Sequence, residues 1–281
     1  MTTGLAGVTA YDLADEKLAA RAYAQMHSEA VCVLPGFLSQ DAVSRMVDEC
    51  DALAPDAHRS APKRNPYLTS ASRGDDSSSA VLYDSLEVLA YDQFPAESSL
   101  RSLYESDHLL DFVRRCLGLS ALYRYADPFG ALNVSIMRDG DVLDWHFDMT
   151  DFVVSIALQS SNSGGEFENA PRIRDLGDKA IATLLSGDRS KVRVEPMTPG
   201  TLMLFNGRRS MHRVSTVRGA TPRYVALLAY DTKPGTDSTD ELKLSRYGRL
   251  PAPHVAANKG RNSDPSSGHH HEPNGSRNAG A

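Results

Sequence analysis

Short apolar segments separated by turns occupy the chain from about residue 119 to 231, and they constrain its fold more than any other feature. The turns contain Ser163-Gly164-Gly165, Ser186-Gly187-Asp188 and Thr198-Pro199-Gly200. Strands are predicted at 121–125, 131–138, 152–159, 180–185, 191–195, 201–205 and 223–230. Several short strands at such spacing are typical of an antiparallel sandwich or barrel rather than of βαβ units.

The part of the chain before this region has helical character. Residues 12–27 place their apolar side chains close to one stripe, which predicts a first helix. A short β-branched run at 30–34 predicts a strand, and Ser39 is a suitable N-cap for a second helix. Two further helices are predicted at 98–104 and 107–117, the second ending at Gly118.

The length of 281 residues, with 41% hydrophobic residues, suits one catalytic domain with extensions. We expect a single domain at 1–250, with a helical part at about 1–118 and a β-rich core at about 119–235. The composition of 251–281 predicts a disordered tail. The segment 55–79 is rich in Pro, Ser, Arg and Asp, so it is either a lid or binding segment or a disordered one.

Composition excludes several classes of partner. The formal net charge is -6, and no block of Lys and Arg provides the basic surface that nucleic-acid binding requires. No apolar run is long enough for a membrane span, and the first residues do not resemble a signal peptide. The three cysteines, Cys32, Cys50 and Cys116, are far apart and are expected to be buried thiols. We therefore expect a cytoplasmic protein with no nucleic-acid or membrane partner.

Three residues form a candidate metal site. His146 and Asp148 are two positions apart, and residues i and i+2 project from the same face of an extended backbone. His212 follows the predicted strand at 201–205 and is the third candidate. Two His and one carboxylate on one side of a ferrous ion leave positions open for a bidentate cosubstrate and O₂. Each residue alone is more often an ordinary core or surface residue, so the prediction depends on their combination and order.

Arg223, eleven residues after His212, is the fourth candidate. A guanidinium forms a forked, charge-assisted pair with a carboxylate such as the distal carboxylate of 2-oxoglutarate. Thr221 lies on the same face of the predicted strand as Arg223. The alternative is a surface arginine at the start of a strand, but the buried character of the strand indicates a charge that needs a partner.

Two other features could contribute to a pocket. On the strand predicted at 131–138, Asn133 shares a face with Ser135 and Met137, so it could bind cosubstrate or substrate, or simply lie on the sheet surface. Acidic residues also gather around the candidate site, where most are expected to be solvated and one or two could receive a cationic substrate. This acidic rim consists of Asp139, Asp141, Asp144, Asp151, Glu166 and Glu168.

These motifs in combination resemble the Fe(II)/2-oxoglutarate-dependent dioxygenases of the phytanoyl-CoA-hydroxylase-like branch. The resemblance covers about 30–231 and includes His146-Phe-Asp148, Gly164-Gly-Glu-Phe167, Pro199-Gly-Thr-Leu-Met-Leu-Phe205, His212 and Arg223. It implies a mainly β fold with flanking helices and a double-stranded β-helix (jelly-roll) core. It also implies that His146, Asp148 and His212 are the iron ligands and that Arg223 binds 2-oxoglutarate.

A weaker resemblance connects 145–159 and 164–174 to relatives of the radical halogenases that act on free amino acids. Those halogenases have a small residue in place of the metal-binding carboxylate, whereas this chain has Asp148. The resemblance therefore implies hydroxylation or a related oxidation rather than chlorination. Many members of the larger family carry a hydroxyl residue two places after the arginine, where this chain has Val225. Thr221, Tyr123 or Tyr125 could supply that contact.

The expected activity is that of a non-haem oxygenase that uses Fe(II), 2-oxoglutarate and O₂, hydroxylates a small free amino acid or a related metabolite, and releases succinate and CO₂. Arg59, Arg64 and Arg73 of the 55–79 segment could supply a guanidinium for the α-carboxylate of such a substrate. The alternative is a cupin-like metal-binding protein or isomerase without oxygenase activity, which the fold alone would permit.

Overall fold

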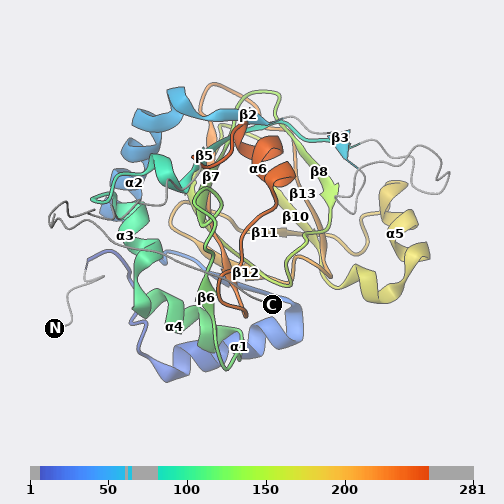
Figure 1. The fold of residues 1–281 in the computed structure, drawn as a ribbon. Helices are drawn as coiled ribbons and strands as arrows, with labels where there is room; N and C mark the ends of the chain where they lie inside the picture. Colours follow the sequence, from blue (N-terminus) through green and yellow to red (C-terminus); the bar gives the residue numbers. More distant parts are fainter. Residues whose placement is uncertain (1–6, 61–62, 65–81, 253–281) are drawn as a thin grey trace, which may run out of the picture. The chain divides into compact units, whose positions relative to one another are not determined.

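A computed structural model describes residues 7–60, 63–64 and 82–252 of the chain (Figure 1). By its internal contacts the chain divides into two units, Met1–Leu250 and Pro251–Ala281. The predicted disorder of the tail falls almost entirely outside the described residues, as does most of the 55–79 segment. The first residues of that segment belong to a 3-10 turn (Ala54–Asp56) and to strand β2 (His58–Ser60).

Four helices lie in the N-terminal part of the sequence, before most of the strands, and confirm the four helices predicted there. They are α1 (Glu16–Glu29), α2 (Gln40–Leu53), α3 (Ser99–Glu105) and α4 (Asp107–Cys116). The side chains of Asp15, Ser39 and Ser98 cap the first three by accepting a hydrogen bond from a backbone N–H of the first turn. In Figure 1 these helices gather on one side of the sheets.

The larger sheet is antiparallel and has seven strands in the order β1-β12-β9-β14-β7-β5-β2. Besides β2, its members are β1 (Val31–Leu34), β12 (Leu202–Phe205), β9 (Val153–Gln159), β14 (Arg223–Leu228), β7 (Leu132–Met137) and β5 (Leu86–Ala90). The predicted strands at 30–34, 131–138, 152–159 and 201–205 lie in this sheet, as do residues 223–228 of the strand predicted at 223–230, whose Tyr230 belongs to a separate ladder. Strands far apart in the sequence thus become neighbours.

The smaller sheet has four strands in the order β11-β10-β13-β8. They are β11 (Arg193–Glu195), β10 (Phe167–Ala170), β13 (Met211–Val214) and β8 (Leu143–His146). Two short ladders join β15 (Tyr230–Asp231) to β6 (Tyr123–Arg124) and β3 (Lys63–Arg64) to β4 (Leu82–Tyr83). The β-rich prediction is therefore correct, although β8, β10 and β13 were not among the strands predicted.

The two faces of the larger sheet pack against different partners. Tyr224, Ala226 and Leu228 of β14 belong to a core shared with the helices, which includes Phe112. On the other face, Met137 and Phe205 pack with Phe167 and Val214 of the smaller sheet. Successive side chains of a strand point to opposite faces of its sheet. Every second side chain of the larger sheet therefore packs against the helices, and the side chains between them point into the space between the two sheets. This arrangement is the double-stranded β-helix core, with helices flanking one side.

One predicted strand is wrong. Residues 180–185 lie in helix α5 (Asp178–Leu185), which follows a 3-10 turn (Ile173–Leu176). Its buried side chains, Ile181 and Leu184, are three positions apart, which fits a helical period. A short apolar run can satisfy either period, so this segment could not be distinguished from a strand by its sequence pattern.

A further helix, α6 (Asp240–Tyr247), was not predicted. Thr239 caps its N-terminus through a side-chain hydrogen bond to Leu242 N, and Gly248 in the left-handed conformation ends it. The helix contacts β2 and β5 at one edge of the larger sheet. Another 3-10 turn, Tyr91–Gln93, follows β5.

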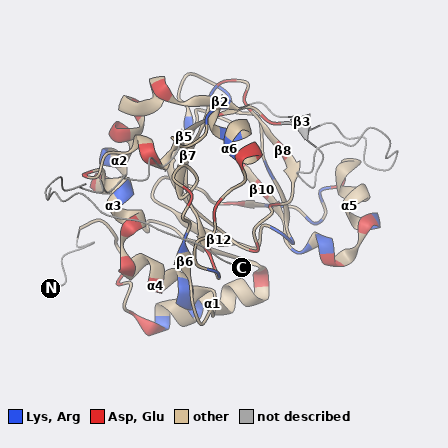
Figure 2. Ribbon diagram, in the orientation of Figure 1, with Lys and Arg blue, Asp and Glu red and all other residues tan. Residues whose placement is uncertain are grey.

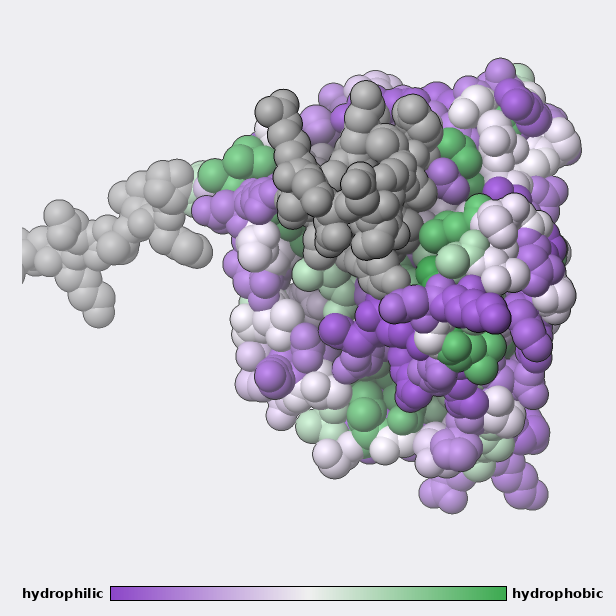
Figure 3. Space-filling model, turned by 90° about the vertical axis from the view of Figure 1, so that its right-hand side faces the viewer, coloured by the Kyte–Doolittle hydropathy of each residue, from purple (hydrophilic) through white to green (hydrophobic). Residues whose placement is uncertain are grey.

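The surface of the described part has mixed character. Basic and acidic residues are interspersed along the helices and strands (Figure 2). On the face seen in Figure 3, hydrophobic groups are separated by hydrophilic ones. No helix among the described residues combines the length and the apolar character that a membrane span requires.

Candidate metal centre

The fold brings His146, Asp148 and His212 together. His146 at the end of β8 pairs across the smaller sheet with His212 of β13, and Asp148 follows two residues later. One nitrogen or oxygen of each residue lies within 4.8 Å of the others, and the described part of the chain contains no other such group of His, Cys, Asp or Glu. The Asp148 carboxylate is 3.8 Å from His146 Nε2 and 3.3 Å from His212 Nε2.

Backbone carbonyls fix the orientation of both imidazoles. Nδ1 of His146 lies 2.7 Å from the carbonyl oxygen of Asp144, and Nδ1 of His212 lies 3.0 Å from that of Ser210. Since a carbonyl oxygen only accepts, each Nδ1 is the donor, and a neutral ring then has its lone pair on Nε2, facing Asp148. Burial lowers the pKa of His212 to about 4, so this ring is neutral at pH 7.

The carboxylate of Asp148 packs against Gly207 on one side and faces the two histidines on the other. The backbone N–H of Asp148 donates to Gly207 O, and a Cβ on Gly207 would lie 2.2 Å from Asp148 Oδ2. Oδ2 is buried and has no hydrogen-bond partner among the described residues. Two imidazole lone pairs and a carboxylate that face one another repel unless a cation lies between them, so the donor set fits a divalent metal ion.

Arg223 lies at the start of β14, on the same face of the larger sheet as Met137, its register partner in β7. The side chain is buried, and burial lowers its pKa to about 10, which leaves the guanidinium charged at neutral pH. A Cβ on Gly165 would come within 2.9 Å of Arg223 Cδ, so the glycine makes room for the arginine. The cavity beside it, of about 240 Å³, is also lined by Phe167, whose ring lies 5.5 Å from that of His212.

The hydroxyl groups of this cavity come from residues that the sequence analysis did not select: Ser160, Ser161 and Thr198. They lie next to turns, where nothing in the local pattern distinguishes them from ordinary turn residues. Thr221 is not among the residues that line the cavity, and its backbone N–H donates to Asn162. Tyr123 is exposed and belongs to the ladder of β6 with β15.

Asn133 lies where the alternation of its strand predicts. It pairs in register with Leu227 of β14, four positions after Arg223, and therefore shares the interior face of the larger sheet. It is buried, and its Oδ1 accepts a hydrogen bond from Arg246 Nη2 of α6 at 3.2 Å.

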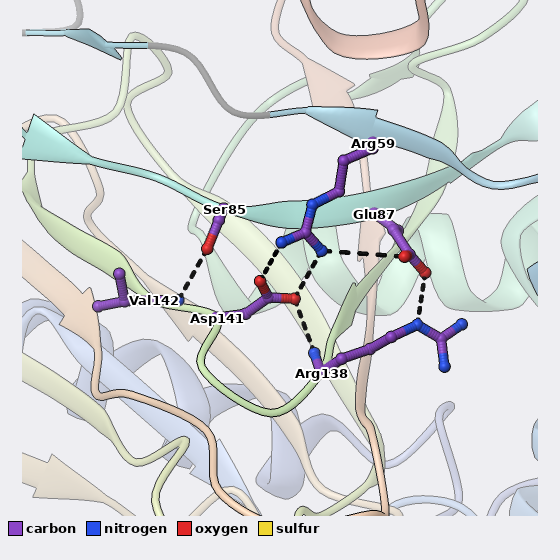
Figure 4. Close-up of polar contacts among 6 residues, drawn as sticks. All are labelled: Arg59, Ser85, Glu87, Arg138, Asp141 and Val142. Atoms are coloured by element: carbon purple, nitrogen blue, oxygen red, sulfur yellow. Dashed lines mark hydrogen bonds and ion pairs between the residues drawn. The ribbon is translucent and has the colours of Figure 1, made fainter.

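Most of the acidic rim already has partners within the chain, so it is poorly suited to receive a cationic group. Asp141 is buried and accepts from the Arg59 guanidinium and from the backbone N–H of Arg138 (Figure 4). Ion pairs also join Asp151 to Arg208 and Glu168 to Arg213. The remaining members accept local hydrogen bonds: Asp139 from Gly219 N, Asp144 from Trp145 N and Glu166 from the Ser215 hydroxyl.

The same network accounts for Arg59, one of the three arginines considered for a substrate carboxylate. Figure 4 shows its guanidinium between Asp141 and Glu87, while Glu87 also binds Arg138 at 2.8 Å. Arg59 therefore ties β2 to the β7–β8 connection. Arg73 and the side chain of Arg64 fall outside the described residues.

Comparison with protein families gives one match. A sequence model of the family described as Halogenase D matches residues 14–243. No curated protein matches the chain in sequence.

Several solved structures share the fold at low sequence identity. The epimerase SnoN in complex with Fe³⁺, α-ketoglutarate and nogalamycin RO has a TM-score of 0.58 at 15% identity, over 90% of this chain and 97% of its own. A prolyl hydroxylase from Trichoplax adhaerens has a TM-score of 0.53 at 18% identity, over 77% and 90%. A 2OG-Fe(II) oxygenase family member from Burkholderia pseudomallei has a TM-score of 0.50 at 18% identity, over 78% and 92%. The chain thus has the fold of the 2OG-Fe(II) oxygenases.

Proposed function

The chain belongs to the halogenase D family, and from this starting point we propose that it is a mononuclear non-haem iron enzyme that oxidises a small molecule with 2-oxoglutarate and O₂. The observation that carries the proposal is the cluster of His146 Nε2, His212 Nε2 and the Asp148 carboxylate, three acceptors that converge on one another. Two imidazoles and one carboxylate on one side are the donor set of non-haem Fe(II) oxygenases.

The protein's own residues would hold and orient the reactants. His146, Asp148 and His212 would hold the iron, and the carbonyl oxygens of Asp144 and Ser210 would keep both rings in the required orientation. Bound Fe(II) with 2-oxoglutarate would supply the activation of O₂. The aromatic rings of Phe167 and Phe205, which pack beside His212, would exclude water from one side of the centre.

Arg223 is the proposed partner of the distal carboxylate of 2-oxoglutarate. Its guanidinium is charged, buried and adjacent to a cavity, and among the described residues the neighbour that raises its pKa is Glu166. A buried guanidinium with unfilled capacity favours a carboxylate ligand, because a forked pair satisfies both charge and hydrogen bonds. Thr221 and Asn133 remain proposed contributors to ligand binding, Asn133 from the interior face of β7.

We propose hydroxylation or a related oxidation rather than halogenation. Asp148 offers a carboxylate where the halogenases of free amino acids have a small residue, so a halide would have to displace a protein ligand. The close packing of the Asp148 carboxylate against Gly207 supports a protein ligand that is held in place and not readily displaced by a halide.

The proposed substrate is a small free amino acid or related metabolite. Support comes from the resemblance of 145–159 to relatives of enzymes that act on free amino acids. Charge attraction between the acidic rim and the ammonium group of an amino acid adds little support, because Asp141, Asp151 and Glu168 are already paired with arginines.

Anaerobic titration with Fe(II) and 2-oxoglutarate tests the proposal directly. The wild-type protein should develop the weak visible band of the iron–2-oxoglutarate chelate and, once O₂ is admitted with pools of amino acids, should release succinate. His212→Ala should lose the band, whereas His108→Ala, on the exposed face of α4, should retain it. A cupin-like protein without oxygenase activity would bind metal and yield no succinate. An unchanged band in His212→Ala would exclude His212 as an iron ligand.

A further inference from the structure

Helix α6 is attached to the edge of the larger sheet. The hydroxyl of Ser60 in β2 donates to Ser245 O, and the buried ammonium of Lys243 pairs at 2.7 Å with Asp237 in the segment just before the helix. At the other end, a Cβ on Gly248 would come within 2.4 Å of the His58 ring, so helix terminus and strand are in close contact. The side chains that α6 directs at the barrel are therefore held in a defined position.

Arg246 is the cation that α6 directs toward the interior face of the larger sheet. Its Nη2 donates to Asn133 Oδ1, while its Nε is buried and has no hydrogen-bond partner among the described residues. The neighbouring cations are neutralised, since Lys243 pairs with Asp237 and Arg249 forms a two-pronged pair with Asp92. Within the described part of the chain, Arg246 has no carboxylate partner. A buried donor without a partner is costly, and a ligand that accepts from it would remove that cost.

The residues around this guanidinium are arranged in one row across the sheet. Asn133 of β7 pairs with Leu227 of β14, and Leu227 pairs on its other side with Ser155 of β9. Ser155 Oγ is buried and has no partner among the described residues. Its register partner Met203 lies two residues before Phe205, whose ring is 4.8 Å from that of His212. The row thus crosses the barrel close to the level of the candidate metal centre.

We propose that Arg246 and Asn133 form an anion subsite that binds a carboxylate of the organic substrate and thereby determines specificity. This inference rests on the proposed oxygenase function and adds a recognition element to it. The free N–H groups of Arg246 and the Nδ2 amide of Asn133 are donors, because Oδ1 of Asn133 is already used as the acceptor. A set consisting only of donors with one positive charge matches a carboxylate.

The subsite is distinct from the one proposed for 2-oxoglutarate. Arg223 is level with Met137 on β7, and Asn133 lies four residues away along the same strand. At about 3.4 Å per residue, roughly 14 Å separate the two positions along the strand. The two cations therefore serve two different carboxylates, at different levels along β7.

Isothermal titration calorimetry tests the inference. The protein is loaded with Fe(II) and 2-oxoglutarate under argon, and the dissociation constants of free L-amino acids are compared with those of the corresponding carboxamides. Wild type should bind at least one acid more tightly than its amide. Arg246→Met should raise the dissociation constant of that acid by about 10- to 100-fold, the range for a lost hydrogen bond to a charged group, and leave the amide unchanged. Arg246→Lys should recover part of the difference. The matched control Arg249→Met removes a charge that already has Asp92 as partner and should change neither value.

Equal binding of acids and amides by wild type, including no binding of either, would overturn the subsite, as would an unchanged preference in Arg246→Met. A change in 2-oxoglutarate affinity instead of acid affinity would assign Arg246 to the cosubstrate and would equally contradict the inference. Succinate formation is measured separately. Its absence would reject the oxygenase function, while the difference between acid and amide would still decide the role of Arg246.

Discussion

Gly207 lies directly against the carboxylate of Asp148: a Cβ at Gly207 would be 2.2 Å from Oδ2 and 2.9 Å from the Cβ of the aspartate. Gly207 has no positive φ, so space and not backbone conformation requires a glycine here. The contact fixes where the carboxylate can lie relative to His146 and His212.

Gly207→Ala should therefore displace Asp148 and weaken iron binding, by roughly the 10- to 100-fold that disturbing the support of a ligand causes. Equilibrium titration with Fe(II) under argon measures this. Gly36→Ala is the control, because that glycine has a positive φ but nothing within 4 Å of an added Cβ. If both variants bind iron equally well, the contact at Gly207 does not position the ligand.

Arg223→Ala should weaken 2-oxoglutarate binding and leave iron affinity nearly unchanged. Truncating one partner of a buried charge pair costs about 2 kcal/mol or more, which is roughly a 30-fold rise in dissociation constant. The exposed Arg218 lies five residues earlier, and Arg218→Ala should have no such effect. The proposed role fails if 2-oxoglutarate dependence is the same in Arg223→Ala and wild type.

Asp148→Gly should abolish hydroxylation, because one protein ligand is lost, and should open a position for a halide. Product analysis by mass spectrometry, with and without added chloride or bromide, checks both parts. Retention of hydroxylation at the wild-type rate would show that Asp148 is not a ligand. Any halogenation by this chain would then not depend on replacing Asp148.

Asp141→Asn should destabilise the fold, because the carboxylate is buried and accepts from the Arg59 guanidinium and from Arg138 N. Arg59 is 48% exposed at its side chain, which reduces the effect, so we expect a loss of about 1–3 kcal/mol in the free energy of unfolding. The control is Glu29→Gln, which breaks an exposed pair with Arg193 and should cost less than about 1 kcal/mol. Denaturant titration of both variants gives the comparison.

The thiols of Cys32, Cys50 and Cys116 should not react with a thiol reagent in the native protein at pH 8. All three are buried, and burial raises the pKa of Cys32 to about 11 and that of Cys116 to about 12, so thiolate is scarce at that pH. The same assay in denaturant should detect three thiols per chain. Rapid labelling of the folded protein would contradict the buried positions.

The sequence determined those features that depend on local spacing. The i, i+2 relation of His146 and Asp148 follows from extended backbone, and short β-branched runs between turns predicted most of the larger sheet because alternation and turn chemistry act within a few residues. Asn133 was placed on the interior face for the same reason. The strand expected at 180–185 failed because its apolar run fits a helix equally well, and α5 is the result.

Tertiary structure alone decided which charges are available for function. Arg59 and Asp141 are 82 positions apart in the sequence, and Arg246 and Asn133 are 113 apart, yet each pair is hydrogen-bonded. Such contacts depend on how the sheets close and where α6 docks, which no local pattern encodes. For this reason Asp141, Asp151 and Glu168 of the acidic rim are paired with arginines and are unavailable to a cationic substrate. Arg246, which belongs to no recognisable motif, instead reaches Asn133 on the interior face of the larger sheet.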